Sequence, residues 1–351
     1  MQKDSLNIQQ FIDKIESNMG RKKDLIVPTK KIMVRPSEIE IHNEGIFKPT
    51  EHCHRQIAAY TKIPVKYYER TMENPDLFAH NVNHWLGQQD EDRMIRLING
   101  DENKARAFLS NRYRRIDNEH IAKAVIPVLS QNPHTIILTS NVTERKLYLM
   151  VAFANREGEV KAGDIVRAGI IITNSEIGQG TFSVLPYVHR LWCDNGAIAD
   201  IGGKYGMKKV HIGRRIEGDE NYIAYKDDTL KADDESLRLK MRDTVESIST
   251  GTMWNEILSG LQQAAKSEEI RRPEKARDEL RKVVDITETE GEGFLKNLLT
   301  DGDLTRWGAG NAITRLANEA DDYDRSVELQ QIGGNVFNMD EKSWNRIAEA
   351  A

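Results

Sequence analysis

The sequence predicts an α+β protein. Its centre is a mainly antiparallel sheet built from hairpins with an intervening helix, flanked by an N-terminal helical region and a C-terminal helical region. Two observations predict this class. Pairs of short β runs are joined by polar or glycine-containing segments, which is the pattern of hairpins. The last third of the chain has helical periodicity throughout. This order differs from the βαβ alternation of a dinucleotide-binding fold.

Residues 1–90 form the first expected region, which is helical. Thr50 is a plausible N-cap for one of its helices, and Pro64 stands in the first turn of the next, where a missing N–H is tolerated. The stretches 32–34 and 39–41 look like short strands or connectors. The expected helices cover residues 1–20, 51–62, 65–72 and 75–86.

Residues 91–216 form the expected sheet core. Asp117 should cap a helix over residues 118–130, and Pro127 inside it predicts a kink or an early end. A last strand is expected at 210–212. The expected hairpins cover residues 93–110, 134–155 and 166–192.

Residues 217–351 form an acidic helical region. They carry 30 acidic and 18 basic residues, a net charge of −12, whereas residues 1–216 carry 25 acidic and 32 basic residues, a net of +7. A split of this kind suggests an anionic partner for the basic half, or attraction between the two halves.

Composition excludes several classes. No apolar run approaches the roughly 18 residues of a membrane span, and the first 23 residues lack the apolar core of a signal peptide. Two cysteines cannot make a disulfide framework, so a reducing compartment, the cytoplasm, is expected. No glycine-rich phosphate loop is recognised, and no cofactor is expected.

Two basic segments, 103–116 and 201–216, contain no acidic residue and one tyrosine each. Basic side chains neutralise phosphates and aromatic rings stack on unpaired bases, so this mixture suits a single-stranded nucleic acid. The alternative is that the charges are solvated or pair with the acidic half. With Arg190, which precedes a turn, the candidate nucleic-acid-binding residues are Arg106, Arg112, Tyr113, Arg114, Arg115, Arg190, Lys204, Tyr205, Lys208 and Lys209.

Two other groups of residues have side chains that could carry out chemistry. Cys193 with His189 and Asn195 has the residue types of a cysteine nucleophile, but a buried cysteine at a strand end explains the pattern more simply. The histidines and cysteine at 52–54, with His80 and His84, lack the spacing of a standard zinc site. Neither a catalytic residue nor a metal ligand is therefore assigned, and a non-enzymatic protein is expected.

Four blocks of sequence resemble the phage/plasmid-like proteins of the domain-of-unknown-function 932 family, which occur in bacteriophages and mobile elements. The blocks begin at His52, Ala105, Tyr187 and Trp307 and keep the family's order. The family has no agreed activity, so the resemblance implies only a setting in replication, recombination or counter-defence.

Three functions remain open from the sequence. The first is single-stranded DNA binding or annealing in recombination or replication, by a protein that assembles as a homo-oligomer. The second is an enzyme of unknown class that uses the Cys193 cluster. The third is a phage protein that binds a host protein through the acidic helices.

Overall fold

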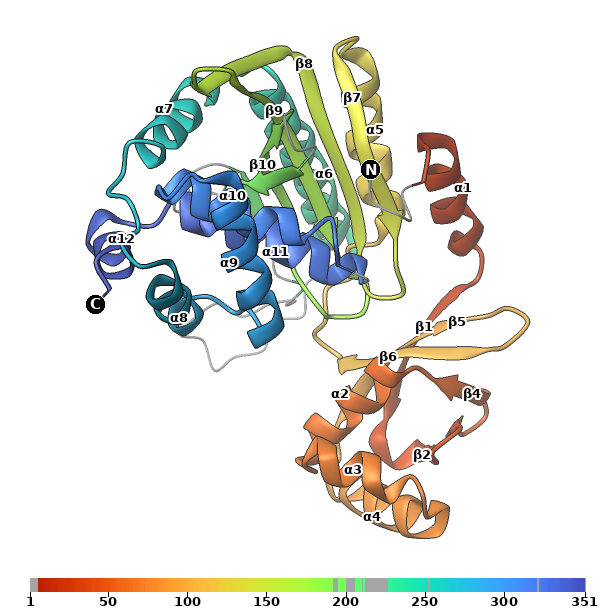
Figure 1. The fold of residues 1–351 in the computed structure, drawn as a ribbon. Helices are drawn as coiled ribbons and strands as arrows, with labels where there is room; N and C mark the ends of the chain where they lie inside the picture. The colour runs from red at the N-terminus through yellow and green to blue at the C-terminus, as the bar shows by residue number, and fades with distance from the viewer. Residues whose placement is uncertain are drawn as a thin grey trace.

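The computed structural model describes residues 6–191, 195–199, 206–209, 211, 227–251, 253–320 and 322–350. These residues form two mostly antiparallel sheets and twelve α-helices, which confirms the predicted α+β class. We call the two sheets the N-terminal sheet and the central sheet. In Figure 1 the N-terminal sheet and its helices lie below the central sheet, and the C-terminal helices lie to one side of the central sheet. None of the described helices combines the length and apolar character needed to cross a membrane.

The N-terminal sheet has six strands in the order β1-β5-β6-β4-β3-β2, and only the β4–β6 pair is parallel. Short strands with alternating buried and exposed residues, as in β2 and β3, suit a sheet with one packed face. The strands are β1 (Lys22–Pro28), β2 (Ile32–Val34), β3 (Ile39–Ile41), β4 (Gly45–Pro49), β5 (Asp92–Ile98) and β6 (Lys104–Ser110).

Three helices pack on one face of this sheet: α2 (Glu51–Thr61), α3 (Val65–Thr71) and α4 (Pro75–Gln88). The Thr50 side chain accepts a hydrogen bond from the Cys53 backbone N–H (3.2 Å), as its N-cap position predicts. Strands and helices bury a core of their own, so this part of the chain is an independent packing unit.

The central sheet has the strand order β11-β10-β9-β8-β7, with β12 paired to β10. Its long strands read as nearly continuous apolar runs because both faces are covered. The strands are β7 (Thr135–Val142), β8 (Leu147–Lys161), β9 (Asp164–Asn174), β10 (Phe182–Arg190), β11 (Asn195–Ile198) and β12 (Met207–Lys209).

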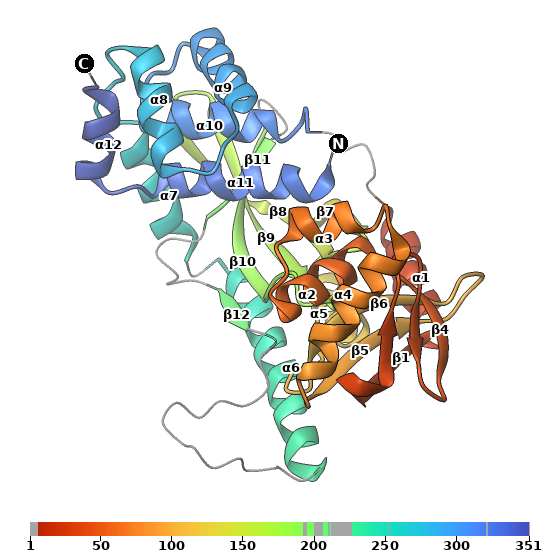
Figure 2. The same cartoon turned by 90° about the horizontal axis from the view of Figure 1, so that it is seen from below.

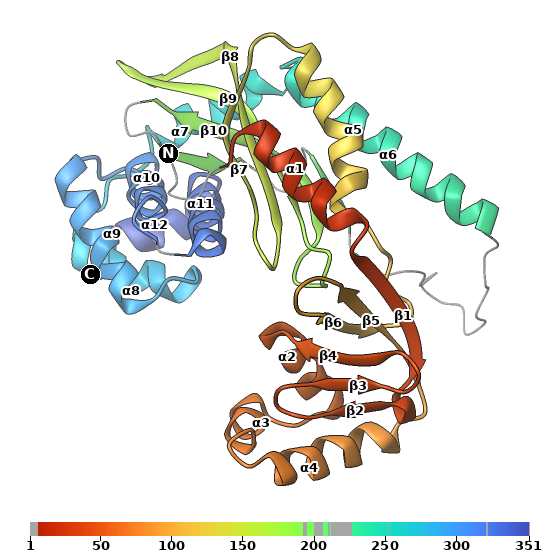
Figure 3. The ribbon, with the colours of Figure 1, turned by 90° about the vertical axis from the view of Figure 1, so that its right-hand side faces the viewer.

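Helices from both ends of the chain cover the central sheet. Three of them pack against its first face: α1 (Ile8–Met19), α5 (Asn118–Gln131) and α6 (Asp227–Ser249). Figure 3 shows α1 and α5 side by side, with α6 beyond them. Pro127 lies inside α5, which ends at Gln131, one residue beyond the expected end of this helix.

The helix over Tyr323–Phe337 covers the second face, the helix over Trp254–Ala264 joins the core of the first face, and the C-terminal helices also form a cluster of their own. On the second face, Tyr323 and Val327 of α11 pack against Tyr148 and Met150. Figure 2 shows the bundle grouped at one end of the molecule, away from the N-terminal sheet. The helices are α7 (Trp254–Ala264), α8 (Pro273–Val283), α9 (Glu288–Asp301), α10 (Arg306–Leu316), α11 (Tyr323–Phe337) and α12 (Glu341–Ala348).

The expected boundary at residue 90 does not match the sheets. β5 and β6, expected in the sheet core, pair instead with the strands of residues 22–49, so the first region is α+β rather than helical. These pairings join segments far apart in sequence, which local patterns do not reveal. The three expected hairpins are confirmed, whereas residues 210 and 212 of the expected last strand lie outside the described residues.

Candidate nucleic-acid interface

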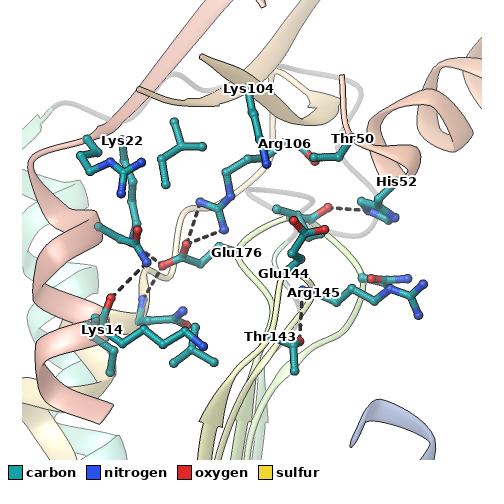
Figure 4. A pocket seen from close by; sticks show the side chains of 18 of the residues that line it. Lys14, Lys22, Thr50, His52, Lys104, Arg106, Thr143, Glu144, Arg145 and Glu176 are labelled. Carbon is teal, nitrogen blue, oxygen red and sulfur yellow. Dashed lines mark hydrogen bonds and ion pairs between the residues drawn. The ribbon is translucent and has the colours of Figure 1, made fainter. Parts of the chain in front are cut away.

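A groove of about 1020 Å³ separates the N-terminal sheet from the central sheet, and we call it the interdomain groove. One wall is the sheet face that α2–α4 leave open, where Lys22, Ile98 and Lys104 stand in one cross-strand row. The other walls are α1, the start of α2, and the turns after β7 and β9 (Figure 4). The groove is thus assembled from segments that lie between residues 6 and 179 of the chain.

Basic side chains from several elements converge on this groove. Seven lysines and arginines line it against five carboxylates, so its lining carries a small net positive charge. Among the residues that the structure describes, no carboxylate lies within ion-pair distance of Lys14, Arg21 or Lys104. The basic lining residues are Lys14, Arg21, Lys22, Arg55, Lys104, Arg106 and Arg145.

Glu176 lies at the floor of the groove, with 2% of its side chain exposed. Its carboxylate accepts hydrogen bonds from the Lys22 ammonium (2.6 Å), the Arg106 guanidinium (3.0 Å) and the Asn118 backbone N–H (2.9 Å). Burial alone would raise the pKa of Glu176, but these partners outweigh burial and lower it to about 2. Glu176 therefore stays ionised and holds Arg106 and Lys22 at the floor.

Arg96 links the two sheets beneath this floor. It is buried, with 2% of its side chain exposed, and binds Asp24 of β1 (2.9 Å), Asp117 at the start of α5 (2.6 Å) and the Glu176 carbonyl oxygen (2.8 Å). Asp117 occupies the N-cap position of α5 but makes no side-chain capping bond, because its carboxylate binds Arg96. The ion pairs make the position of one sheet depend on the other.

Hydrogen bonds to residues beside the central sheet and beside the N-terminal sheet hold the turn between β9 and β10. The Ser175 hydroxyl donates to the Arg145 carbonyl oxygen (2.9 Å) and accepts from the Gln179 backbone N–H (3.0 Å). The Ile177 carbonyl oxygen faces Nε2 of His52 (3.0 Å), which must donate to it. Burial lowers the pKa of His52, so its ring is neutral at pH 7.

The side chains of the first basic segment, 103–116, lie in different surroundings. Arg106 lines the groove, whereas Arg114 pairs with Asp233 and Asp234 of α6, as the alternative of pairing with the acidic half describes. Arg115 is 58% exposed with one contact to Asp24 (3.4 Å). Arg112 is also exposed.

Tyr113 has its ring stacked on His211 (5.1 Å between centroids, 4° between planes), and its hydroxyl donates to the Ser175 carbonyl oxygen (3.0 Å). The Arg114 backbone N–H also donates to the His211 carbonyl oxygen (3.0 Å). The two basic segments therefore meet at this point, although outside the groove.

The Arg190 guanidinium donates two hydrogen bonds to the Asp164 carboxylate (2.7 and 2.8 Å) and lies over the Trp307 ring. Lys208 and Lys209 extend along β12, which pairs with Phe182 and Ser183 of β10. Lys204 and Tyr205 lie outside the described residues.

The other constellations gain no support from the described residues. Among them, no group of three or more His, Cys, Asp or Glu side chains could hold a metal ion. Cys53 is buried and its pKa is raised by burial, so its thiol is unreactive. His189 is buried opposite Gly196, and Cys193 lies outside the described residues.

Sequence reasoning missed Lys14, Arg21, Lys22, Arg145 and Gln179 as groove residues. Each belongs to a different local element, and only the packing of the two sheets brings them together. The acid-free composition around Lys104 and Arg106 was the one local signal that led to the groove.

Comparison with family models, curated proteins and solved structures finds no match to this chain.

Proposed function

We propose that this protein binds single-stranded nucleic acid, DNA in the first place, along the interdomain groove. The observation that carries the proposal is the convergence of Lys14, Arg21 and Lys104 on one groove without carboxylate partners among the described residues. Cations that are not neutralised within the protein are available to phosphates.

The form of the groove favours a single strand over a duplex. Proteins read duplex DNA by inserting a protruding helix or ribbon into a DNA groove, whereas this site is a recess. A single strand can enter a recess and turn its bases toward polar side chains. Amide side chains from α1 and the central sheet lie among the basic residues for that purpose.

The small net charge sets the expected strength and salt dependence. Contacts from three cations to a single strand give a slope of log K against log salt of about −2. Binding should therefore be moderate at physiological salt. Its affinity should fall more steeply with rising salt than the affinity for a neutral ligand.

The resemblance to phage and mobile-element proteins supports a setting in recombination or replication, where single strands are annealed or protected. Several copies of the chain can bring two strands together, so a homo-oligomer belongs to the same proposal. These statements rest on analogy, whereas the groove residues give the proposal its direct test.

Fluorescence anisotropy of labelled single-stranded DNA, single-stranded RNA and duplex DNA at two salt concentrations tests the proposal. We expect Lys104→Glu and Lys14→Glu each to weaken single-strand binding on the order of tenfold, because each puts a like charge beside a phosphate. Lys66→Glu is the matched control, since Lys66 is exposed on α3 outside the groove.

Equal affinities for all three variants and the wild type would exclude the groove. If Arg115→Glu alone weakened binding, the exposed end of the first basic segment would be the site instead. Binding that ignores salt would contradict the proposal altogether.

A further inference from the structure

The helices α3 and α4 concentrate exposed apolar side chains on the side of the N-terminal sheet that faces away from the interdomain groove. In the part of the chain that the structure describes, twelve large apolar side chains are exposed, and four of them lie on these two helices. Single exposed apolar residues are ordinary on a protein surface, whereas a concentration of them on adjacent elements marks an interaction surface. We call the four side chains the outer helix surface: Val65 (41% exposed), Tyr67 (47%), Leu77 (47%) and Trp85 (48%).

The fold does not need these four side chains for its own core. On their inner sides the two helices bury Tyr68, Phe78 and Leu86, and the rings of Tyr68 and Phe78 meet edge to face with 4.9 Å between their centroids. The His84 ring meets the Trp85 indole edge to face (5.1 Å). The outer helix surface therefore stands on a packed support, which limits the entropy lost when a partner covers it.

The composition of α4 is that of a protein–protein contact. Its 14 residues include Asp76 but no Glu, Lys or Arg, whereas Asp, Glu, Lys and Arg together make up 30% of the chain. The centres of protein interfaces are depleted of charged residues and enriched in aromatic ones, with Trp prominent among the residues that contribute most to binding. A helix that binds a membrane surface or nucleic acid needs Lys or Arg for the phosphates, and α4 has neither. The composition therefore favours another protein surface as the partner.

We propose that the outer helix surface forms the contact between two copies of this chain. The proposal rests on and deepens the proposed function, to which a homo-oligomer belongs. In a two-fold contact each surface meets the same surface of its partner, so a charge close to the axis would face its own copy. The helix α4 avoids this repulsion, because its one carboxylate, Asp76, lies in its first turn.

The border of the outer helix surface suits the same partner. The exposed charged residues on α3 and in the turn after it are Lys66, Glu69, Arg70 and Glu73. Two are basic and two are acidic, so opposite charges of the two copies can pair at the rim of the contact.

This contact leaves the interdomain groove of both copies open. Figures 1 and 3 show α3 and α4 at the end of the molecule farthest from the central sheet. A dimer formed through these helices therefore carries two grooves, each able to hold one strand. Two strands held by one dimer are what the proposed annealing role requires of an oligomer.

Sedimentation velocity of the full chain over a wide range of concentrations tests the contact. The variants Trp85→Glu and Leu77→Glu each place a carboxylate in the outer helix surface, and two positions keep the test decisive if one variant does not fold. Leu299→Glu is the matched control, because Leu299 is also exposed (55%) but lies on α9. Circular dichroism spectra that match the wild type establish that the variants are folded.

We expect the wild type and Leu299→Glu to pass from monomer to dimer as the concentration rises. Trp85→Glu and Leu77→Glu should each raise the dissociation constant of the dimer by about tenfold or more, because a desolvated carboxylate in the contact lacks a partner. Both variants should bind a single-stranded DNA oligonucleotide with the affinity of the wild type, since their grooves are intact.

A wild type that stays monomeric at every concentration, alone and with the oligonucleotide, overturns the proposal. A wild-type dimer that neither variant weakens, or that Leu299→Glu weakens as much, overturns the outer helix surface as the contact. Either result leaves salt-dependent groove binding standing, because anisotropy measures that binding separately. Failure of the wild type to bind any single strand at low salt overturns the proposed function instead, so the two failures are distinguishable.

Discussion

Arg96 joins two domains from a position that solvent hardly reaches. Its guanidinium faces Asp24, Asp117 and a backbone carbonyl, so its removal leaves two carboxylates without their buried partner. Breaking a buried ion pair on one side is costly because the remaining charge stays desolvated.

We predict that Arg96→Met lowers the free energy of unfolding by about 3–5 kcal/mol. Arg115→Met is the matched control: Arg115 contacts the same Asp24 but is largely exposed, so its loss should cost about 1 kcal/mol or less. Urea denaturation with constant slope measures both, and equal costs would contradict the structural role of Arg96.

The low pKa of Glu176, at the floor of the interdomain groove, predicts that the stability of the fold depends on pH. The pKa of Glu176 is about 2 in the folded protein against a usual value of 4.5, so its ion pairs stabilise the fold above pH 4.5. This stabilisation should be lost as the pH falls from about 4.5 to about 2. The difference in unfolding free energy between wild type and Glu176→Gln should shrink over that range, and a constant difference would contradict the assignment.

At the scale of elements, α11 approaches β11 through a glycine. A Cβ on Gly334 would lie 2.0 Å from the Ile198 carbonyl oxygen, so the helix can lie against the strand only without a side chain there. Gly87, at the exposed end of α4, has no atom within 4 Å of its would-be Cβ.

Alanine substitutions at these two glycines should therefore differ in sign. Gly334→Ala should destabilise by about 1–3 kcal/mol, because helix and strand must separate. Gly87→Ala should stabilise by about 0.5–1 kcal/mol, because alanine restricts the unfolded chain and suits a helix. Thermal or urea unfolding of both variants checks the contrast, which the same sign in both would contradict.

Sequence patterns predicted the elements that depend on neighbours along the chain. The three hairpins and the Thr50 cap depend on alternation, turns and a capping side chain within a few residues. The patterns missed the pairing of β1 with β5 and of β4 with β6, since these strands are short and the paired residues lie 56 or more positions apart.

At the scale of the molecule, ion pairs between the basic and acidic halves of the chain neutralise part of the charge asymmetry. Arg114 binds two carboxylates of α6, and Lys161 binds Asp303 (2.6 Å) in the acidic half. Among the described residues, Lys14, Arg21 and Lys104 of the interdomain groove have no carboxylate partner. Composition revealed the asymmetry, but only the packing of two sheets determines which cations remain unpaired.

Hydrogen–deuterium exchange with and without a single-stranded DNA oligonucleotide tests most directly the central claim that the interdomain groove binds a single strand. We predict slower exchange in residues 14–22, 104–110, 141–146 and 175–180, which border the groove, and unchanged exchange in residues 65–88 on the opposite side of the N-terminal sheet. Protection confined to residues 112–116 and 206–209, with the groove segments unaffected, would contradict the claim that the groove binds the strand.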